Sequence, residues 1–191
     1  SPDSPLLGGA TGLLQFTDRG FHISNAQARL HGGMVRFEGG MPASDTEQAS
    51  PIRFRGQGTV SAEGLQQTGA GFVSRLFQQA SGSTSYTAQL GFRAGEPELV
   101  VTSDLQGLAL NLPAPLNKTA TESLPLRFES AVVSVVGDQA RTDRLSVSLG
   151  SPAAPILALQ YERDLGEAEP RVLRGSLAIG LREDESAPLP E

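Results

Sequence analysis

The residues best suited to catalysis or metal binding are few and scattered in this 191-residue chain. The chain has two histidines, His22 and His31, and no cysteine, so it can form neither a disulfide nor a thiolate metal site. Neither histidine stands at a recognisable metal-ligand spacing from carboxylates. The Gly-x-Ser-x-Gly turn that carries the nucleophile of many serine hydrolases is absent. We therefore expect no metal site and no hydrolytic triad.

Other groups that could do chemistry have simpler structural roles. Asp18, Asp104, Asp138 and Asp164 fall at predicted turns, where an aspartate side chain commonly accepts bonds from nearby backbone N–H groups. No two acids stand out as the paired carboxylates of a glycosidase. The segment 69–71, Gly-Ala-Gly, lacks both the lysine and the spaced glycines of a phosphate-binding loop. We expect no enzyme activity and no cofactor.

The charge and hydropathy patterns exclude two further classes. The net charge is −6, with fourteen arginines and a single lysine, Lys118, spread along the chain. Because no basic stripe is available to follow a phosphate backbone, we expect no nucleic-acid partner. No stretch approaches the ~18 apolar residues that a transmembrane helix requires. The chain begins without Met and without a signal peptide, and we expect it to be a segment of a longer protein.

Strict alternation of apolar and polar residues dominates the chain and predicts a mainly β protein of about ten strands. The clearest case is the segment 83–93, where Tyr86, Leu90 and Phe92 fall on one face of the predicted strand. Gln89 falls on the other face. The prolines of Leu112–Leu116 end the alternation, since proline lacks the N–H donor of a strand ladder.

One segment, 61–80, has a different period and predicts a single amphipathic helix. Its apolar or small residues lie at positions 65, 69, 72, 73, 76, 77 and 80, which is helical spacing. Ser61 is suited to the N-cap and Gly82 to the residue after the C-terminus. Three glycines weaken the first half, so we expect the helix to be best formed over 71–80.

A single helix cannot cover a sheet of this size. A helix is about 10 Å wide, enough for two or three strands spaced ~4.8 Å apart. The strands nevertheless have one apolar face each, and that face must be covered. The sheet can pack on itself as a sandwich, close into a barrel, or curl into an open trough whose lining meets a ligand or neighbouring segments. Periodicity alone does not choose between these three forms.

A short ordered pattern after the predicted helix resembles a known family. The pattern consists of Ser103-Asp104-Leu105, Gly107, Leu112-Pro113, Pro115-Leu116 and Lys118. It is similar to the SDL-G…LP-PL-K segment of YhdP-type AsmA-like proteins of the Gram-negative envelope, and the resemblance is strongest over residues 61–129. This resemblance implies a long curved sheet with an apolar groove that carries phospholipid between the inner and outer membranes.

The resemblance also implies a set of residues that contact lipid. The apolar strand faces that would line the groove are Tyr86, Leu90, Phe92, Leu99, Val101, Leu126 and Phe128. The alternative is a structural or protein-interaction domain in which these side chains form a closed core without a ligand. Lys118 and the proline loop could contact lipid headgroups or a partner, or could be purely structural, and we favour the structural role.

We expect one β-rich domain over 1–182, a segment of a longer AsmA-like protein, followed by a polar tail over 183–191. The resemblance implies a location in the periplasm, as part of a protein anchored in the inner membrane. The expected partners are phospholipid and neighbouring segments of the same longer chain, with the membrane reached through parts outside these residues.

Overall fold

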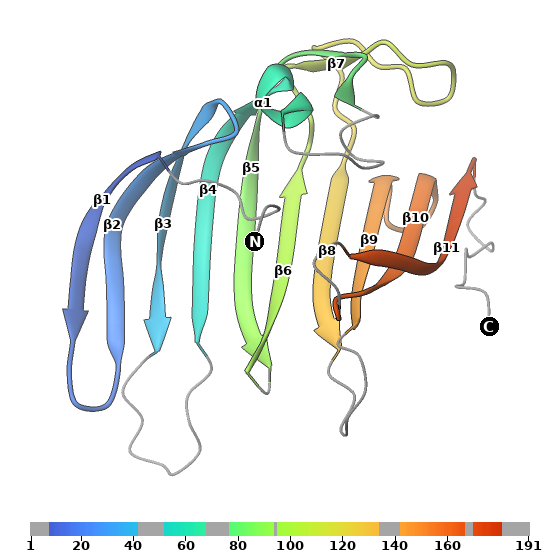
Figure 1. Cartoon of the computed structure of the whole chain (residues 1–191). Helices are drawn as coiled ribbons and strands as arrows, with labels where there is room; N and C mark the ends of the chain where they lie inside the picture. Colours follow the sequence, from blue (N-terminus) through green and yellow to red (C-terminus); the bar gives the residue numbers. More distant parts are fainter. Residues whose placement is uncertain are drawn as a thin grey trace.

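The chain folds around one antiparallel sheet. The structure is a computed structural model, and it describes residues 8–41, 52–67, 77–93, 95–133, 142–166 and 170–180. Those residues form eleven strands and one short helix (Figure 1). In chain order the elements are β1 (Gly8–Phe16), β2 (Phe21–Leu30), β3 (Gly33–Met41), β4 (Arg53–Ser61), α1 (Ala62–Gln66), β5 (Ala80–Arg93), β6 (Glu96–Ser103), β7 (Leu108–Leu110), β8 (Leu126–Val133), β9 (Thr142–Gly150), β10 (Pro155–Asp164) and β11 (Arg171–Ile179).

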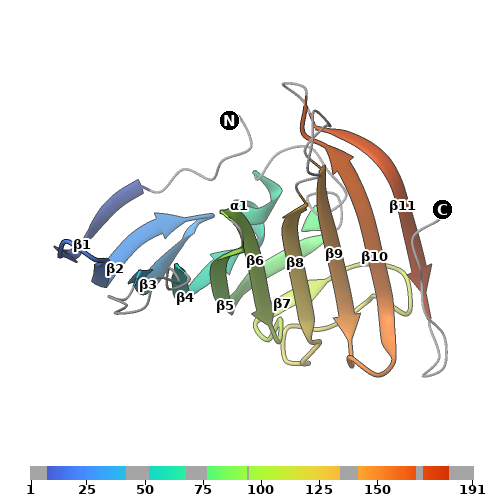
Figure 2. The ribbon, with the colours of Figure 1, turned by 90° about the horizontal axis from the view of Figure 1, so that it is seen from below.

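The order of strands in the sheet follows the order in the chain. Ten strands are neighbours in the sequence β1-β2-β3-β4-β5-β6-β8-β9-β10-β11, and β7 pairs with β5 off this path. The first and last strands do not pair with each other, so the sheet is not closed into a barrel. Figure 2, seen from below, shows the sheet curved into an arc with α1 on its inner side. The predicted mainly β fold with a curved antiparallel sheet is confirmed in its open form.

Two ends of the sheet differ in what lies over them. At one end, the top of Figure 1, β4 leads into α1, and β7 pairs with the start of β5. We call this the capped end, and we call α1, β7 and the turns on either side of β7 (residues 104–107 and 111–125) the cap. At the other end lies the β1–β2 turn, in which the Thr17 N–H donates to the Gly20 carbonyl at 2.8 Å. We call this the hairpin end.

The most deeply buried residues lie at the capped end. Leu105, Leu108 and Leu110 from the cap pack with Leu149 and Leu157 of the sheet, and all five side chains are 0–2% exposed. Ala62 of α1 and Phe77 belong to the same cluster. The hydrophobic core of the described residues therefore lies between the cap and strands β8 to β10.

The helix prediction was right in its start and wrong in its end. Ser61 is the N-cap of α1, and its hydroxyl accepts from the Gly64 N–H at 3.1 Å. α1 covers five residues and Phe77 is again helical, while the segment 68–76, which contains most of the half expected to be best formed, lies outside the described residues. Gly82 is not the residue after a helix. It lies inside β5 with φ +93°, opposite Leu108, because pairing with β7 draws the chain into the sheet from Ala80 onward.

Candidate functional site

The seven residues predicted to contact lipid lie together on one face of the sheet. They come from the three neighbouring strands β5, β6 and β8. The register places Leu90 opposite Leu99 and Val101 opposite Phe128, and residues directly opposite in an antiparallel pair point to the same side. Tyr86, Phe92 and Leu126 share that side by the two-residue repeat of a strand. All seven are half-buried, neither sealed in the core nor freely exposed.

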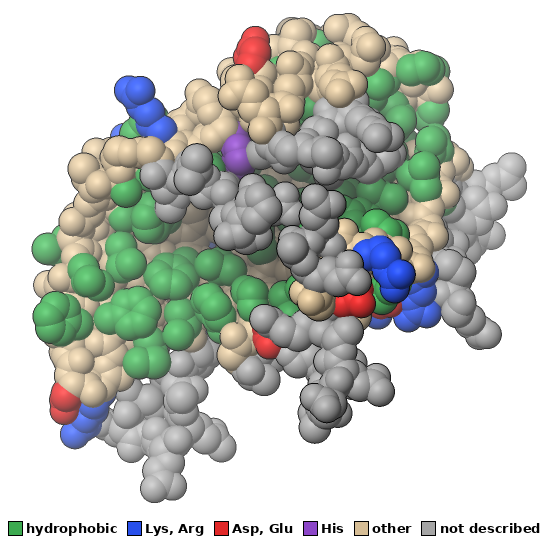
Figure 3. Space-filling model, in the orientation of Figure 1, with side chains coloured by type: hydrophobic (Ala, Val, Ile, Leu, Met, Phe, Trp, Pro, Cys, Tyr) green, Lys and Arg blue, Asp and Glu red, His purple; other side chains and the backbone are tan. Residues whose placement is uncertain are grey.

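This apolar face continues across nearly the whole sheet. One row of directly paired residues crosses nine strands without a polar side chain; we call it the middle row. Its members, from β2 to β11, are Ala26, Phe37, Gly56, Ala88, Val101, Phe128, Val147, Leu159 and Leu177. Figure 3 shows hydrophobic side chains gathered over the β1 to β5 part of this face. The face is apolar along the whole row, but Val147 and Leu159 are covered within the core cluster, while Phe37, Ala88, Val101 and Phe128 are half-buried.

The row one residue further along the same strands is polar at seven of its nine positions. Its members are Gln27, Arg36, Gln57, Thr87, Thr102, Arg127, Ser148, Ala158 and Ala178. An open hollow of about 890 Å³ lies on this outer face, and its lining includes Arg36, Gln57 and Arg127. The Thr87 and Thr102 hydroxyls are hydrogen-bonded across β5 and β6 at 2.7 Å. The lining of this hollow also includes Tyr86 and Leu126, so it is not separate from the seven predicted residues.

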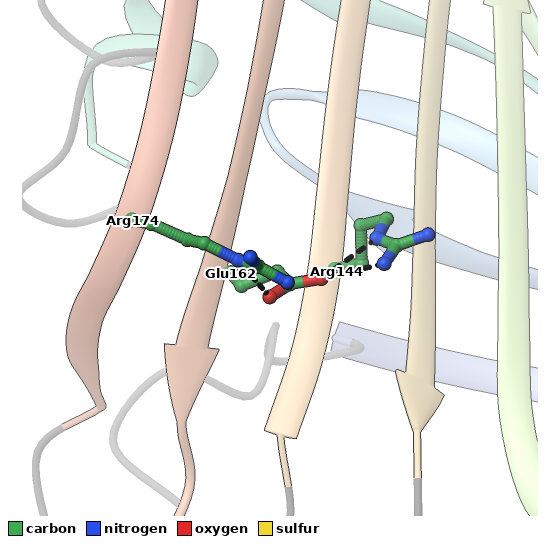
Figure 4. A network of polar contacts seen from close by, with 3 residues as sticks. All are labelled: Arg144, Glu162 and Arg174. Carbon is green, nitrogen blue, oxygen red and sulfur yellow. Dashed lines mark hydrogen bonds and ion pairs between the residues drawn. The ribbon is translucent and has the colours of Figure 1, made fainter. Parts of the chain in front are cut away.

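An ion-pair ladder strengthens the outer face of the last three strands (Figure 4). Glu162 of β10 accepts from Arg144 of β9 at 3.0 Å and from Arg174 of β11 at 2.7 Å. These two bonds hold the pKa of Glu162 below its usual range. The contacts join strands that are already paired through their backbones, which suits a structural role.

Tyr86 fills the space above a glycine. It pairs with Gly58 of β4, and a Cβ built at Gly58 would lie only 3.1 Å from the Tyr86 hydroxyl and 2.5 Å from the Met34 carbonyl oxygen. The ring therefore lies across β4, where a larger residue does not fit. Burial raises the pKa of Tyr86, and its hydroxyl has no hydrogen-bond partner within the described residues.

The residues that carry the family pattern build the cap. The Ser103 hydroxyl accepts from the Leu105 N–H at 3.0 Å and donates to the Ser85 carbonyl at 2.6 Å. Asp104 accepts from the Gln106 N–H at 3.0 Å, as expected for an aspartate at a turn. Gly107 has φ +91°, and a Cβ there would lie 2.4 Å from the Ser83 carbonyl oxygen, so only glycine fits. The Ser103 to Gly107 part of the pattern is thus explained by the geometry of one tightly bonded turn.

Lys118 lies inside this cap. Its side chain is only 6% exposed, and its ammonium donates to the carbonyls of Leu105 (2.8 Å), Leu108 (2.6 Å) and Thr119 (2.9 Å). Burial lowers the pKa of Lys118, although the negative charges of Glu122 and Asp104 act in the opposite direction. Of the two roles considered for Lys118, the geometry supports the structural one, because all three ammonium protons are used within the cap.

Two charged residues on the apolar face were not singled out from the sequence. Asp143 of β9 and Arg163 of β10 are direct partners, one repeat beyond Leu145 and Tyr161 toward the hairpin end. Arg163 donates from Nε to Oδ1 at 3.0 Å and from Nη2 to Oδ2 at 2.5 Å. The two-residue repeat of each strand already predicts this face, since Asp143 is two before Leu145 and Arg163 is two after Tyr161.

The residues that the structure describes contain neither a cluster of metal-binding side chains nor a helix that could cross a membrane. No group of three or more His, Asp or Glu side chains there converges as a metal site would. His22 is exposed, while His31 is half-buried and its pKa is lowered by burial. Within the same residues, no helix is both long enough and apolar enough to span a bilayer.

Comparison with known proteins identifies one family. A family model described as YhdP protein matches residues 3–190. The resemblance noted in the sequence is therefore confirmed, and it extends well beyond residues 61–129. No curated protein and no solved structure matches this chain.

Proposed function

The chain belongs to the YhdP family, and from this premise we propose that it forms one stretch of an apolar β-groove that shields phospholipid acyl chains in transit between the inner and outer membranes. Membership suggests an envelope protein of the lipid-transport type, in a family that is not known as an enzyme family. The proposed location is the periplasm, within a protein anchored in the inner membrane, and the proposed partners are phospholipid and neighbouring segments of the same longer chain.

The observation that carries this proposal is the middle row on the inner side of an unclosed sheet. Nine strands contribute directly paired residues without a polar side chain. Moving one methylene from water onto such a surface is favourable by about 0.8 kcal/mol. Each carbon that a lipid chain lays on the half-buried members of the row, Phe37, Ala88, Val101 and Phe128, therefore adds affinity without a specific contact.

Transport of this kind requires no catalytic residue. It needs a continuous apolar path, with polar groups kept to the outer face so that the protein remains hydrated. The alternation between the middle row and the row beside it meets both needs on seven of the nine strands; on β10 and β11 the second row has Ala158 and Ala178. The alternative, a domain that binds another protein through this face, predicts protein contacts at the same positions instead of lipid.

Site-specific photocrosslinking in the full-length protein within the envelope tests the proposal. A photoreactive residue replaces Leu90, Phe92, Val101 or Phe128 on the inner face. The matched controls are Gln89 and Arg55, directly paired residues that are exposed on the outer face of β5 and β4. We expect phospholipid adducts at the four inner positions and none at the two controls.

The outcomes separate the two functions. Adducts to protein alone at the inner positions would support the interaction domain. If neither set gives an adduct, and protease resistance shows that the protein is still folded, the proposed lipid groove is contradicted. Equal lipid adducts at both sets would indicate nonspecific contact with membrane and would also contradict the proposal.

A further inference from the structure

A second open hollow lies on the outer face, over strands β2 to β4. Its volume is about 510 Å³, within the ~300–1,000 Å³ range of small-molecule sites. Its polar side chains are three amides, two guanidinium groups and one carboxylate, those of Asn25, Gln27, Gln57, Arg36, Arg55 and Glu38. Within the part of the chain that the structure describes, none of these six side chains forms a hydrogen bond or an ion pair.

Strand pairing brings these side chains to one place. Two rows of directly paired residues form the floor of the hollow, namely Gln27–Arg36–Gln57 and Glu38–Arg55. Asn25 lies at a bulge of β2 and has φ 51°, in the left-handed region. A bulge often redirects a side chain beside a binding site, and here Asn25 joins the lining of the hollow.

Exposed polar side chains are ordinary on a hydrated sheet face, but the other half of this face is different. On β8 to β11, arginines donate to glutamates, as Arg127 does to Glu129 at 2.8 Å and Arg174 does to Glu162 at 2.7 Å. On β2 to β4, one glutamate, Glu38, is accompanied by four exposed arginines: Arg29, Arg36, Arg53 and Arg55. A chain of net charge −6 thus has a local positive surface, which attracts anions.

We propose that this hollow binds an acidic saccharide, with Arg36 and Arg55 donating to its anionic group. The Glu38 carboxylate can only accept hydrogen bonds, so it needs a donor such as a sugar hydroxyl and would repel a bare anion. The primary amides of Gln27 and Gln57 both donate and accept, as hydroxyl groups do. A ligand with an anionic group beside several hydroxyls therefore satisfies all the groups that line the hollow. This site lies on the outer face and does not depend on the proposed lipid groove.

The hollow has room for more than one sugar. Arg36 and Gln57 also line the larger hollow of about 890 Å³, together with Thr87 and Thr102. These four residues are directly paired from β3 to β6, and neighbouring strands lie about 4.8 Å apart. An oligosaccharide can therefore continue from the acidic sugar across the strands, along side chains that offer amide and hydroxyl groups.

The test measures saccharide binding to the full-length protein by isothermal titration calorimetry. The probes are a trimer of galacturonic acid and the neutral trisaccharide maltotriose. The wild type is expected to bind the acidic trimer more tightly. Arg36→Gln/Arg55→Gln should lower the affinity for the acidic trimer about tenfold or more, because it removes charge-assisted hydrogen bonds, and should leave maltotriose binding unchanged. Gln27→Ala/Gln57→Ala should weaken binding of both trisaccharides by a similar factor.

The matched control is Arg144→Gln/Arg174→Gln, which removes the same charge from the outer face of β9 and β11 and should leave both affinities unchanged. Equal losses in this control and in the Arg36/Arg55 variant would reduce the effect to net charge and overturn the proposal. Inorganic phosphate that binds as tightly as the trimer would show an anion site without saccharide recognition. Binding of phosphatidylglycerol vesicles but of neither trisaccharide would assign the surface to a membrane, and no binding of any probe also overturns the proposal. Lipid crosslinking at Val101 tests the groove separately, so either proposal can fail alone.

Discussion

The capped end and the middle of the sheet are two parts of one apolar face with different surroundings. Leu149 at the capped end is 0% exposed, packed beneath the leucines of β7 and the turn before it. Leu99 and Leu90, in the middle of the sheet, are only half-buried, whereas Leu145, in the same row on β9, is 7% exposed. The residue types and the strand pattern are the same, so what separates a core from a lining is the element placed over it.

The cap is also where the backbone is most constrained. Its turns are joined by bonds from Gly107 N–H to the Ala120 carbonyl at 2.8 Å and from Leu110 N–H to the Lys118 carbonyl at 2.9 Å. Such bonds are required because buried backbone groups without partners are costly. The cap is thus a small, fully bonded structure that closes one end of the face, and it gives the groove a defined end.

Shortening one leucine in each part tests most directly whether the two parts differ in packing. Leu149→Ala should lower the free energy of unfolding by about 3–5 kcal/mol, since it leaves a cavity in a packed core. Leu99→Ala should cost about 1 kcal/mol, because the side chain already contacts solvent. Denaturant unfolding followed by circular dichroism gives both values. Equal losses would mean that the middle of the face is packed as tightly as the capped end.

The sequence predicted the faces far better than it predicted what covers them. Strand alternation is local, so Tyr86, Leu90 and Phe92 could be assigned to one side from spacing alone, and the register agrees. Coverage depends on contacts between distant segments. The start of β5 at Ala80 follows from its pairing with Leu110, thirty residues later, and no local signal at 80–82 outweighed the helical spacing before it.

The same distinction explains what was missed at the candidate site. The seven predicted residues share a face because two-residue periodicity and antiparallel pairing are regular. The contact between Asp143 and Arg163 depends on the register of β9 against β10, which the sequence does not state. Likewise, the burial of Lys118 follows from the fold of the turn that surrounds it, not from the residue type, since lysine is rarely buried.

Removing the buried ammonium tests whether the cap depends on Lys118. Lys118→Met keeps much of the side chain's length but leaves the Leu105, Leu108 and Thr119 carbonyls without this donor. We expect a loss of about 2–3 kcal/mol in unfolding free energy, because hydrogen bonds from a charged donor are strong and unpaired buried acceptors are costly. Hydrogen exchange should speed up at Leu110 and Gly107 and remain unchanged in β2 and β3. Unchanged exchange in the cap would show that Lys118 does not hold it together.

The smallest expected effect compares a glycine in each part. Gly107→Ala in the cap places a methyl group at φ +91° and 2.4 Å from a backbone oxygen, and should cost about 1–2 kcal/mol. Gly91→Ala in β5 meets nothing within 4 Å, has no positive φ and faces the outer side, so it should be neutral or slightly stabilising. Thermal melts of the two variants against wild type separate these outcomes. Neither substitution touches the inner face, so crosslinking of lipid at Val101 should be unchanged in the Gly91 variant. A loss of crosslinking there would mean that lipid contact depends on the outer face. That result would contradict the division of the sheet into an apolar inner face and a polar outer face.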